Sequence, residues 1–146
     1  DERFAARRAA WYRVPEELDG TGATVARLVA ELRALIDDAQ VPLSERHAAE
    51  VAQLEAWEEE YGTRGSGRRA LEERHRREVR LLREDELRLG LATLAARYRE
   101  RLVTAPDPAP YAAACRRITE ASEALLRNPN EALLLQALFL DLPPLE

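Results

Sequence analysis

Apolar residues recur along much of the chain at the spacing of an α-helix. The clearest run lies over residues 23–36, where one continuous stripe is formed by Val25, Leu28, Val29, Leu32, Leu35 and Ile36. Before it, Phe4, Trp11 and Val14 mark one face of a shorter helix. We expect that first helix to end before Pro15, because proline disfavours the helical conformation of the residue that precedes it.

The following segments alternate between predicted helices and predicted breaks. Residues 37–42 are expected to end the second helix, since they run from two aspartates to a proline. Ser44 is suited to cap a third helix over 44–61, whose apolar side carries Ala48, Val51, Leu54, Trp57 and Tyr61. The glycine-rich stretch 62–67 is expected to be a plain linker, because a phosphate site there would lack both a preceding strand and a lysine.

Residues 68–103 are predicted to form one helix about 54 Å long at 1.5 Å per residue. Its first part, 68–86, is unusual because 13 of its 19 residues are Arg, Glu or Asp. Opposite charges there stand four apart, a spacing that stabilises an exposed helix, in Glu72/Arg76, Glu73/Arg77, Arg74/Glu78 and Arg80/Glu84. An apolar stripe returns after Glu86. The charged half is therefore expected to protrude from the domain as an arm.

The C-terminal third predicts two further helices. A proline-rich loop at 104–110 precedes a helix over 111–125, and Asn130 is suited to cap a last helix over 131–141. Leucines surround the axis of that last helix on nearly all sides, so we expect it to be buried among other helices. The fold class predicted for the whole chain is an all-α helical bundle of about five to six helices with a long charged helix as a protruding arm.

Composition agrees with a helical fold and narrows the function. Ala and Leu fill a third of the 146 positions, whereas Val, Ile and Thr together fill only 15. All 22 basic residues are Arg, so phosphate-loop and Schiff-base chemistry that need lysine are excluded. The lone Cys115 excludes intramolecular disulfides and is expected in the core. With neither a signal peptide nor 18 consecutive apolar residues, we expect a cytoplasmic protein without a membrane partner.

No constellation of residues indicates catalysis, and we expect neither a catalytic residue, nor a cofactor, nor a metal site. His47 and His75 lie far apart in the sequence, and the arginines that flank them disfavour a cation nearby. The carboxylate runs lie among arginines, which a solvated surface explains. The serines are a predicted cap, a linker residue and a mid-helix residue, none of them in a nucleophile motif.

The arginine-rich stretch leaves one alternative function open. Between Arg64 and Glu84 there are eight arginines and four glutamates, an excess that attracts phosphates at low salt. A nucleic-acid-binding helical adaptor would use residues 68–83, although aromatic residues for base stacking are absent there. A salt-bridged surface helix and a packing surface for another protein explain the same residues.

Three segments carry a pattern beyond helical periodicity. In 121–143, the turn Arg127-Asn128-Pro129-Asn130 leads into a leucine-rich helix closed by Leu142-Pro143. Residues 84–102 contain the aromatic-Arg-acidic run Tyr98-Arg99-Glu100, and 14–23 contain Val14-Pro15 followed by Asp19-Gly20-Thr21-Gly22. Together these segments resemble the C-terminal collar domain of the bacterial DNA polymerase III clamp-loader delta-prime subunit, in its actinobacteria-like form. The related gamma/tau subunit shares the Asn-x-Asn turn and is the alternative.

The resemblance implies a non-catalytic assembly module of the replicative clamp loader. Residues 1–18 would be a short helix and linker from a preceding nucleotide-binding module, and 19–146 the helical collar or oligomerisation domain. The chain, which has no Met, would be a piece of a longer polypeptide. Its partners would be the gamma/tau and delta subunits, with indirect association with the sliding clamp and primed DNA. Trp57, Tyr98 and Tyr111 are the aromatic residues that we expect to be partly exposed and to anchor those contacts.

Overall fold

The computed structural model describes residues 1–63, 65 and 67–146 of the chain. Over these residues the fold is all-α and holds no β-strand, which confirms the predicted class. The elements in chain order are α1 (Glu2–Glu17), α2 (Gly22–Tyr61), α3 (Arg68–Thr104), α4 (Ala109–Ala124), a short 3₁₀ helix η1 (Leu125–Arg127) and α5 (Glu131–Asp141). The predicted linker 62–67 includes Arg64 and Ser66, which lie outside the described residues.

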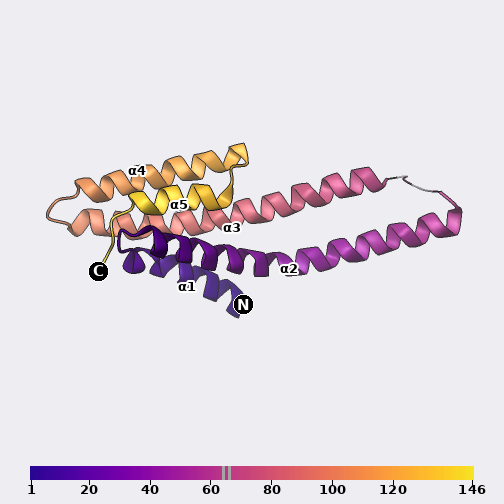
Figure 1. The fold of residues 1–146 in the computed structure, drawn as a ribbon, viewed down its shortest axis with the longest axis horizontal. Helices are drawn as coiled ribbons and strands as arrows, with labels where there is room; N and C mark the ends of the chain where they lie inside the picture. Colours follow the sequence, from indigo (N-terminus) through magenta and orange to yellow (C-terminus); the bar gives the residue numbers. More distant parts are fainter. Residues whose placement is uncertain (64, 66) are drawn as a thin grey trace.

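The molecule has two parts, a bundle and an arm (Figure 1). In the bundle, α1, α4 and α5 surround the first half of α2 and the second half of α3. We define the arm as residues 37–61 and 68–86, the remaining halves of α2 and α3. There α2 leads out of the bundle and α3 lies beside it and returns to the bundle. The charged half of α3 protrudes from the bundle, as predicted. The continuation of α2 along it, which covers one side of the arm, is an addition that the sequence pattern did not predict.

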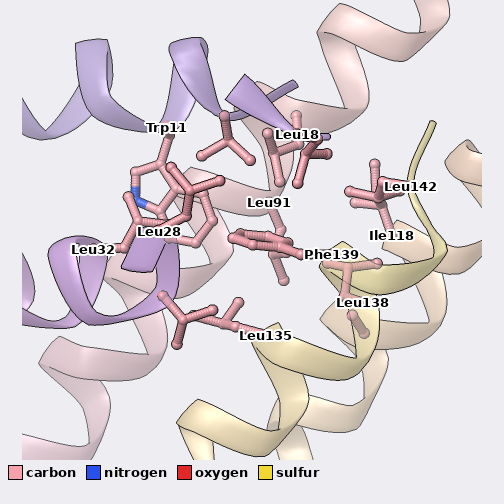
Figure 2. Close-up of a cluster of buried hydrophobic side chains, with 14 of the residues drawn as sticks. Trp11, Leu18, Leu28, Leu32, Leu91, Ile118, Leu135, Leu138, Phe139 and Leu142 are labelled. Atoms are coloured by element: carbon pink, nitrogen blue, oxygen red, sulfur yellow. The ribbon is translucent and has the colours of Figure 1, made fainter. Parts of the chain in front are cut away.

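A single apolar core fills the bundle (Figure 2). All five helices contribute to it, and α1 belongs to it through Trp11 and Val14, with Leu18 directly after the helix. The rings of Trp11 and Phe139 meet edge to face, with their centroids 6.3 Å apart. Gly90 lies directly beneath the Trp11 indole, so close that a Cβ at this position would stand 2.0 Å from the ring. On α2 the core ends at Ile36, and on α3 it begins at Leu87.

The predicted break at residues 37–42 is absent, since α2 passes through Pro42 without ending. Ser44 is therefore an interior residue of the helix and not a cap. An interior proline costs a helix about 3 kcal/mol, partly through the hydrogen bond it cannot donate. Here Pro42 and Asp38, whose carbonyl loses that bond, are both exposed, so water can satisfy the carbonyl. Contacts of α2 with α3 on both sides of Pro42, from Asp37 to Arg83 and from Arg46 to Glu78, hold the two segments in line.

The first helix also continues past a proline, against our expectation. Helix α1 includes Pro15 and ends at Glu17. Pro15 is buried, and its carbonyl accepts a hydrogen bond of 2.8 Å from the N–H of Leu145. One turn earlier, the carbonyl of Tyr12 accepts a hydrogen bond from the guanidinium of Arg97. These tertiary contacts stabilise a last helical turn that local propensity alone disfavours.

Helix α5 begins where predicted, but it is not buried on all sides. The Asn130 side chain accepts a hydrogen bond of 3.0 Å from the N–H of Leu133, which confirms the predicted cap. The core-facing residues are Leu135, Leu138 and Phe139. On the opposite side, Leu133 and Leu140 are 65% and 56% exposed. The prediction of all-round burial is wrong because α5 packs on α2 and α4 at the outside of the bundle.

The arm is an antiparallel helical hairpin. Residues that face each other across it have residue numbers whose sum is about 125. Glu78 faces His47, Glu50 faces His75, and the contact between Glu58 and Arg68 continues this register toward the tip. Half-buried residues of α3 stand at alternating spacings of four and three, as in a coiled coil, at Leu71, His75, Glu78 and Leu82. The same register places Leu54 opposite Leu71.

Ion pairs in the arm differ from those predicted. Of the four pairs expected within α3, only Arg74 with Glu78 is formed, at 3.6 Å. Glu73 instead contacts Arg69, and several arginines reach across to α2. Ion pairs between the two helices form in place of pairs within α3, because a carboxylate of α2 lies as close to these arginines as a carboxylate of α3. No helix in the described part of the chain is long and apolar enough to cross a membrane.

Candidate functional site

The three aromatic residues expected at an interface lie in different environments. Tyr98 is fully buried, with no exposed surface. Its hydroxyl donates a hydrogen bond of 2.6 Å to the carbonyl of Pro143, and burial raises the pKa of that phenol well above its usual value. The expectation that Tyr98 is partly exposed is therefore wrong. Its position in the apolar stripe of α3 was the signal that it packs inward.

Trp57 and Tyr111 are accessible, but they are not close in the sequence or on the same part of the molecule. Trp57 lies near the tip of the arm, is 45% exposed and packs against Tyr61 with ring centroids 5.2 Å apart. Tyr111 lies at the start of α4, is half-buried and has the Arg101 guanidinium 5.2 Å from its ring centre. No single surface therefore contains all three aromatic residues, and the roles of Trp57 and Tyr111 in partner binding stay predictions.

An exposed apolar stripe on α5 was not foreseen. Leu133, Ala137 and Leu140 are exposed and stand four and three residues apart, so they share one face of the helix. Isolated exposed leucines are common on protein surfaces, whereas apolar residues aligned on one face indicate a contact surface. We call these three residues the α5 stripe. The continuous leucine run in the sequence contained this signal, but we assigned every leucine to the core.

Buried charges mark the junction between bundle and arm. Arg83 of α3 donates two parallel hydrogen bonds, of 2.7 and 2.8 Å, to the carboxylate of Glu131 at the start of α5. The same guanidinium contacts Asp37 at 2.7 Å and Gln40 at 3.0 Å on α2. Both Arg83 and Glu131 have less than a fifth of their side chains exposed. These hydrogen bonds hold the pKa of Glu131 below its ordinary value and tie α2, α3 and α5 together at one point.

Two histidines and two glutamates meet in the middle of the arm. The imidazole rings of His47 and His75 are stacked, with centroids 3.7 Å apart and planes inclined by 13°. The Nε2 atom of His47 lies 3.5 Å from Glu78, and that of His75 lies 3.4 Å from Glu50. One potential metal-ligating atom from each of the four residues falls within 4.8 Å of the other three. We call these four residues the His/Glu cluster.

The cluster overturns one of the two grounds against a metal site, the separation of the histidines in the sequence, whereas the neighbouring Arg46 and Arg74 do contact the carboxylates. His47 and His75 are 28 residues apart in the sequence, but the hairpin brings their rings into contact. The missed signal is an internal repeat. The sequence Glu-Arg-His-x-x-Glu-Val occurs at residues 45–51 and again at 73–79, once on each helix of the arm. An antiparallel pair of equal segments related in this way presents each histidine to the glutamate of the other helix.

The arginine-rich side of α3 borders a cleft of about 670 Å³ between the arm and the α4–α5 turn. Arg76, Arg77 and Arg80 line it, together with apolar atoms of Leu125 and Pro129. Within the described part of the chain these three arginines make no ion pair, unlike Arg68, Arg69, Arg74 and Arg83. The positive charge expected from the sequence is thus reduced by pairing but not removed.

Comparison with known proteins adds no identification. No protein-family model matches the chain, and neither curated proteins nor solved structures gave a match.

Proposed function

We propose that this chain is a non-catalytic assembly module, the collar-type domain of a clamp-loader subunit of the delta-prime kind. The observation that carries the proposal is the α5 stripe. A helix that exposes Leu133 and Leu140 beside its buried leucines leaves apolar area that a neighbouring subunit would remove from water, at about 25 cal/mol for each square ångström buried. The same helix carries the segment that resembles the clamp-loader family.

The turn before α5 supports this proposal. Asn128 adopts a left-handed conformation with φ of 50°, which asparagine tolerates better than most residues. Asn130 then caps α5, and Glu131 in its first turn is held by Arg83. The Asn-Pro-Asn motif therefore sets the direction in which α5 leaves the turn, and with it the side of the bundle on which the α5 stripe lies.

In this function the chain binds other proteins and performs no chemistry itself. Its proposed partners are the gamma/tau and delta subunits in the cytoplasm, with the sliding clamp and primed DNA reached only through the assembled complex. Exposed Trp57 and half-buried Tyr111 are secondary anchor candidates, since aromatic side chains provide large contact area with few rotatable bonds to fix.

The test is sedimentation of the chain with the collar region of gamma/tau, alone and with delta present. A complex is expected, and Leu133→Asp and Leu140→Asp are expected to abolish it while leaving the circular dichroism spectrum unchanged. Leu81→Asp is the matched control, because Leu81 is a leucine of similar exposure on the arm. Absence of any complex with the wild-type chain, or equal losses with Leu81→Asp, would count against the proposal.

The second candidate is a nucleic-acid-binding adaptor that uses residues 68–83. It is favoured by one observation, the three arginines at 76, 77 and 80 that border the cleft without an ion pair in the described structure. A mobility-shift titration in moderate salt separates the two functions. Saturable binding that weakens with salt and disappears when all three arginines are replaced by glutamine would support the adaptor, and no shift would support the assembly module.

A further inference from the structure

The His/Glu cluster in the arm has no part in the proposed assembly function. We propose that His47, Glu50, His75 and Glu78 form a binding site for one divalent transition-metal ion, with Zn²⁺ as the best-fitting ion. Such an ion would link α2 to α3 in the middle of the arm. This inference does not depend on the identity of the assembly partner.

The positions of the ligands follow from the two helices. On α2 the histidine and glutamate stand three residues apart, at 47 and 50, so both side chains point from one face. Helix α3 repeats this spacing at 75 and 78 and runs in the opposite direction. Sites built from two ligands on each of two facing helices are a common way for helical proteins to hold a metal.

The two imidazoles lack partners for the atoms that would bind a metal. Nε2 of His47 and Nε2 of His75 are both buried and make no hydrogen bond in the structure. His47 is nine-tenths buried, and the His75 side chain is only 12% exposed. A buried polar atom without a partner costs about 1–3 kcal/mol, and a metal ion coordinated by both nitrogens would satisfy the two atoms at once.

Two of the ligand spacings are close to those around a coordinated ion, and all four ligand atoms lie within 4.8 Å of one another. Tetrahedral Zn²⁺ holds nitrogen and oxygen ligands at about 2.0–2.2 Å, which places ligand atoms about 3.4 Å from one another. The nitrogen-to-oxygen distances across the arm are already 3.4 and 3.5 Å. The stacked rings must turn about their Cβ–Cγ bonds, because in-plane lone pairs of parallel rings do not converge. A turn of this kind moves side chains without moving either helix.

Two arginines position the carboxylates. Arg46 contacts one oxygen of Glu78, and Arg74 contacts one oxygen of Glu50. The other oxygen of each carboxylate faces a histidine across the arm. The facing oxygens also lie within ion-pair distance of these arginines, at 3.6 Å for Arg74 and Glu78 and at 3.8 Å for Arg46 and Glu50, so a bound ion would draw them away from the guanidiniums. The arginines would keep their shorter contacts to the second oxygens, as outer partners of metal-ligating carboxylates commonly do.

The ligand chemistry selects the class of ion. Imidazole nitrogen suits Zn²⁺, Cu²⁺, Ni²⁺ and Fe²⁺, whereas Mg²⁺ and Ca²⁺ prefer oxygen ligands alone. The two carboxylates offset the charge of a divalent ion, in competition with the Arg46 and Arg74 guanidiniums that they already contact. Four protein ligands around one ion leave no open position in tetrahedral geometry, so the site fits a structural ion and not a catalytic one.

The decisive measurement uses nitrogen NMR of the histidine rings in the 146-residue chain without an affinity tag. His47 and His75 are its only histidines, so every ring signal is assigned to the cluster. On titration with Zn²⁺ we expect the Nε2 signals of both rings to shift together and to saturate at one equivalent. No saturable shift, or a shift of one ring alone, would overturn the proposal and leave the cluster as a polar layer that only sets the hairpin register.

Substitutions give an independent test through calorimetric titration with Zn²⁺. His47→Gln and His75→Gln are each expected to weaken binding at least about tenfold, since even outer-shell substitutions cost metal sites about 10–100-fold. Glu59→Gln is the matched control, as Glu59 is an exposed carboxylate on α2 beyond the cluster, and it should leave the affinity unchanged. Circular dichroism of the metal-free variants checks that they fold. Undiminished binding by either histidine variant would also overturn the site.

Discussion

The bundle and the arm are built from the same two long helices, yet different forces hold α2 and α3 together in each. In the bundle, the helices meet through an apolar core that ends at Ile36 and Leu87. In the described part of the arm, the buried side chains are those of His47 and Glu58. The bundle therefore gains stability from the burial of apolar area, and the arm depends on polar contacts and half-buried leucines.

The arm shows how a hairpin can be specific without being strongly stabilised. Exposed ion pairs contribute about 0–1 kcal/mol each, whereas a buried leucine contributes several times as much. Polar residues in a helical seam, however, penalise every register that leaves them unpaired. The polar seam thus makes the arm less stable but defines its register. The ion pair between Arg83 and Glu131 fixes the base of the arm to the bundle.

Truncation of one leucine in each part gives the largest expected contrast. Leu138 has no exposed surface, so Leu138→Ala should lower the free energy of unfolding by about 2–5 kcal/mol. Leu54 is only half-buried in the arm, and Leu54→Ala should cost about 1 kcal/mol and accelerate amide exchange in the arm alone. Urea denaturation and hydrogen exchange measure both. An equal loss of global stability would mean that arm and bundle unfold as one unit.

A smaller effect is expected at the close contact between α1 and α3. Gly90→Ala places a methyl group against the buried indole of Trp11, and we expect a net loss of about 1–3 kcal/mol despite the better helix propensity of alanine. Gly22→Ala is the control, because nothing lies within 4 Å of its added Cβ. Thermal unfolding compares the two variants. A Gly90→Ala protein as stable as Gly22→Ala would show that Trp11 does not pack tightly in the bundle.

The smallest expected effect concerns pH at the junction. Hydrogen bonds from Arg83 lower the pKa of Glu131 from its ordinary value of 4.5. A lowered folded-state pKa means that this carboxylate stabilises the fold above pH 4.5 and that the stabilisation is lost as the pH falls through the folded-state pKa. Glu131→Gln should therefore be less stable than wild type at pH 7, and the difference should shrink in acid. Chemical denaturation at several pH values follows it, and a difference independent of pH would contradict this assignment.

Local pattern predicted the helices well and their ends poorly. The stripes from Val25 to Ile36 and from Leu87 to Tyr98 are true core faces, because burial and periodicity share one cause. The sequence predicts that helices end near Pro15 and Pro42, but both helices continue past these prolines. The sequence pattern reflects only the local cost of a proline, and contacts with distant residues outweigh that cost. The same limit applies to the candidate site. That His47 meets His75 depends on a hairpin register, which no single stretch of sequence contains.

The side-by-side course of α2 and α3 also separates charge across the width of the arm. Over residues 37–61, α2 carries eight acidic residues and one arginine, whereas over 68–86 α3 carries seven arginines and six acidic residues. The net charge is thus −7 on the α2 side and +1 on the α3 side, so the α2 side is strongly negative and the α3 side nearly neutral. Near a polyanion the α2 side is repelled, which favours orientations with α3 toward the polyanion, within a Debye length of about 10 Å at 0.1 M salt. The arm therefore has a preferred orientation about its long axis before it contacts the polyanion.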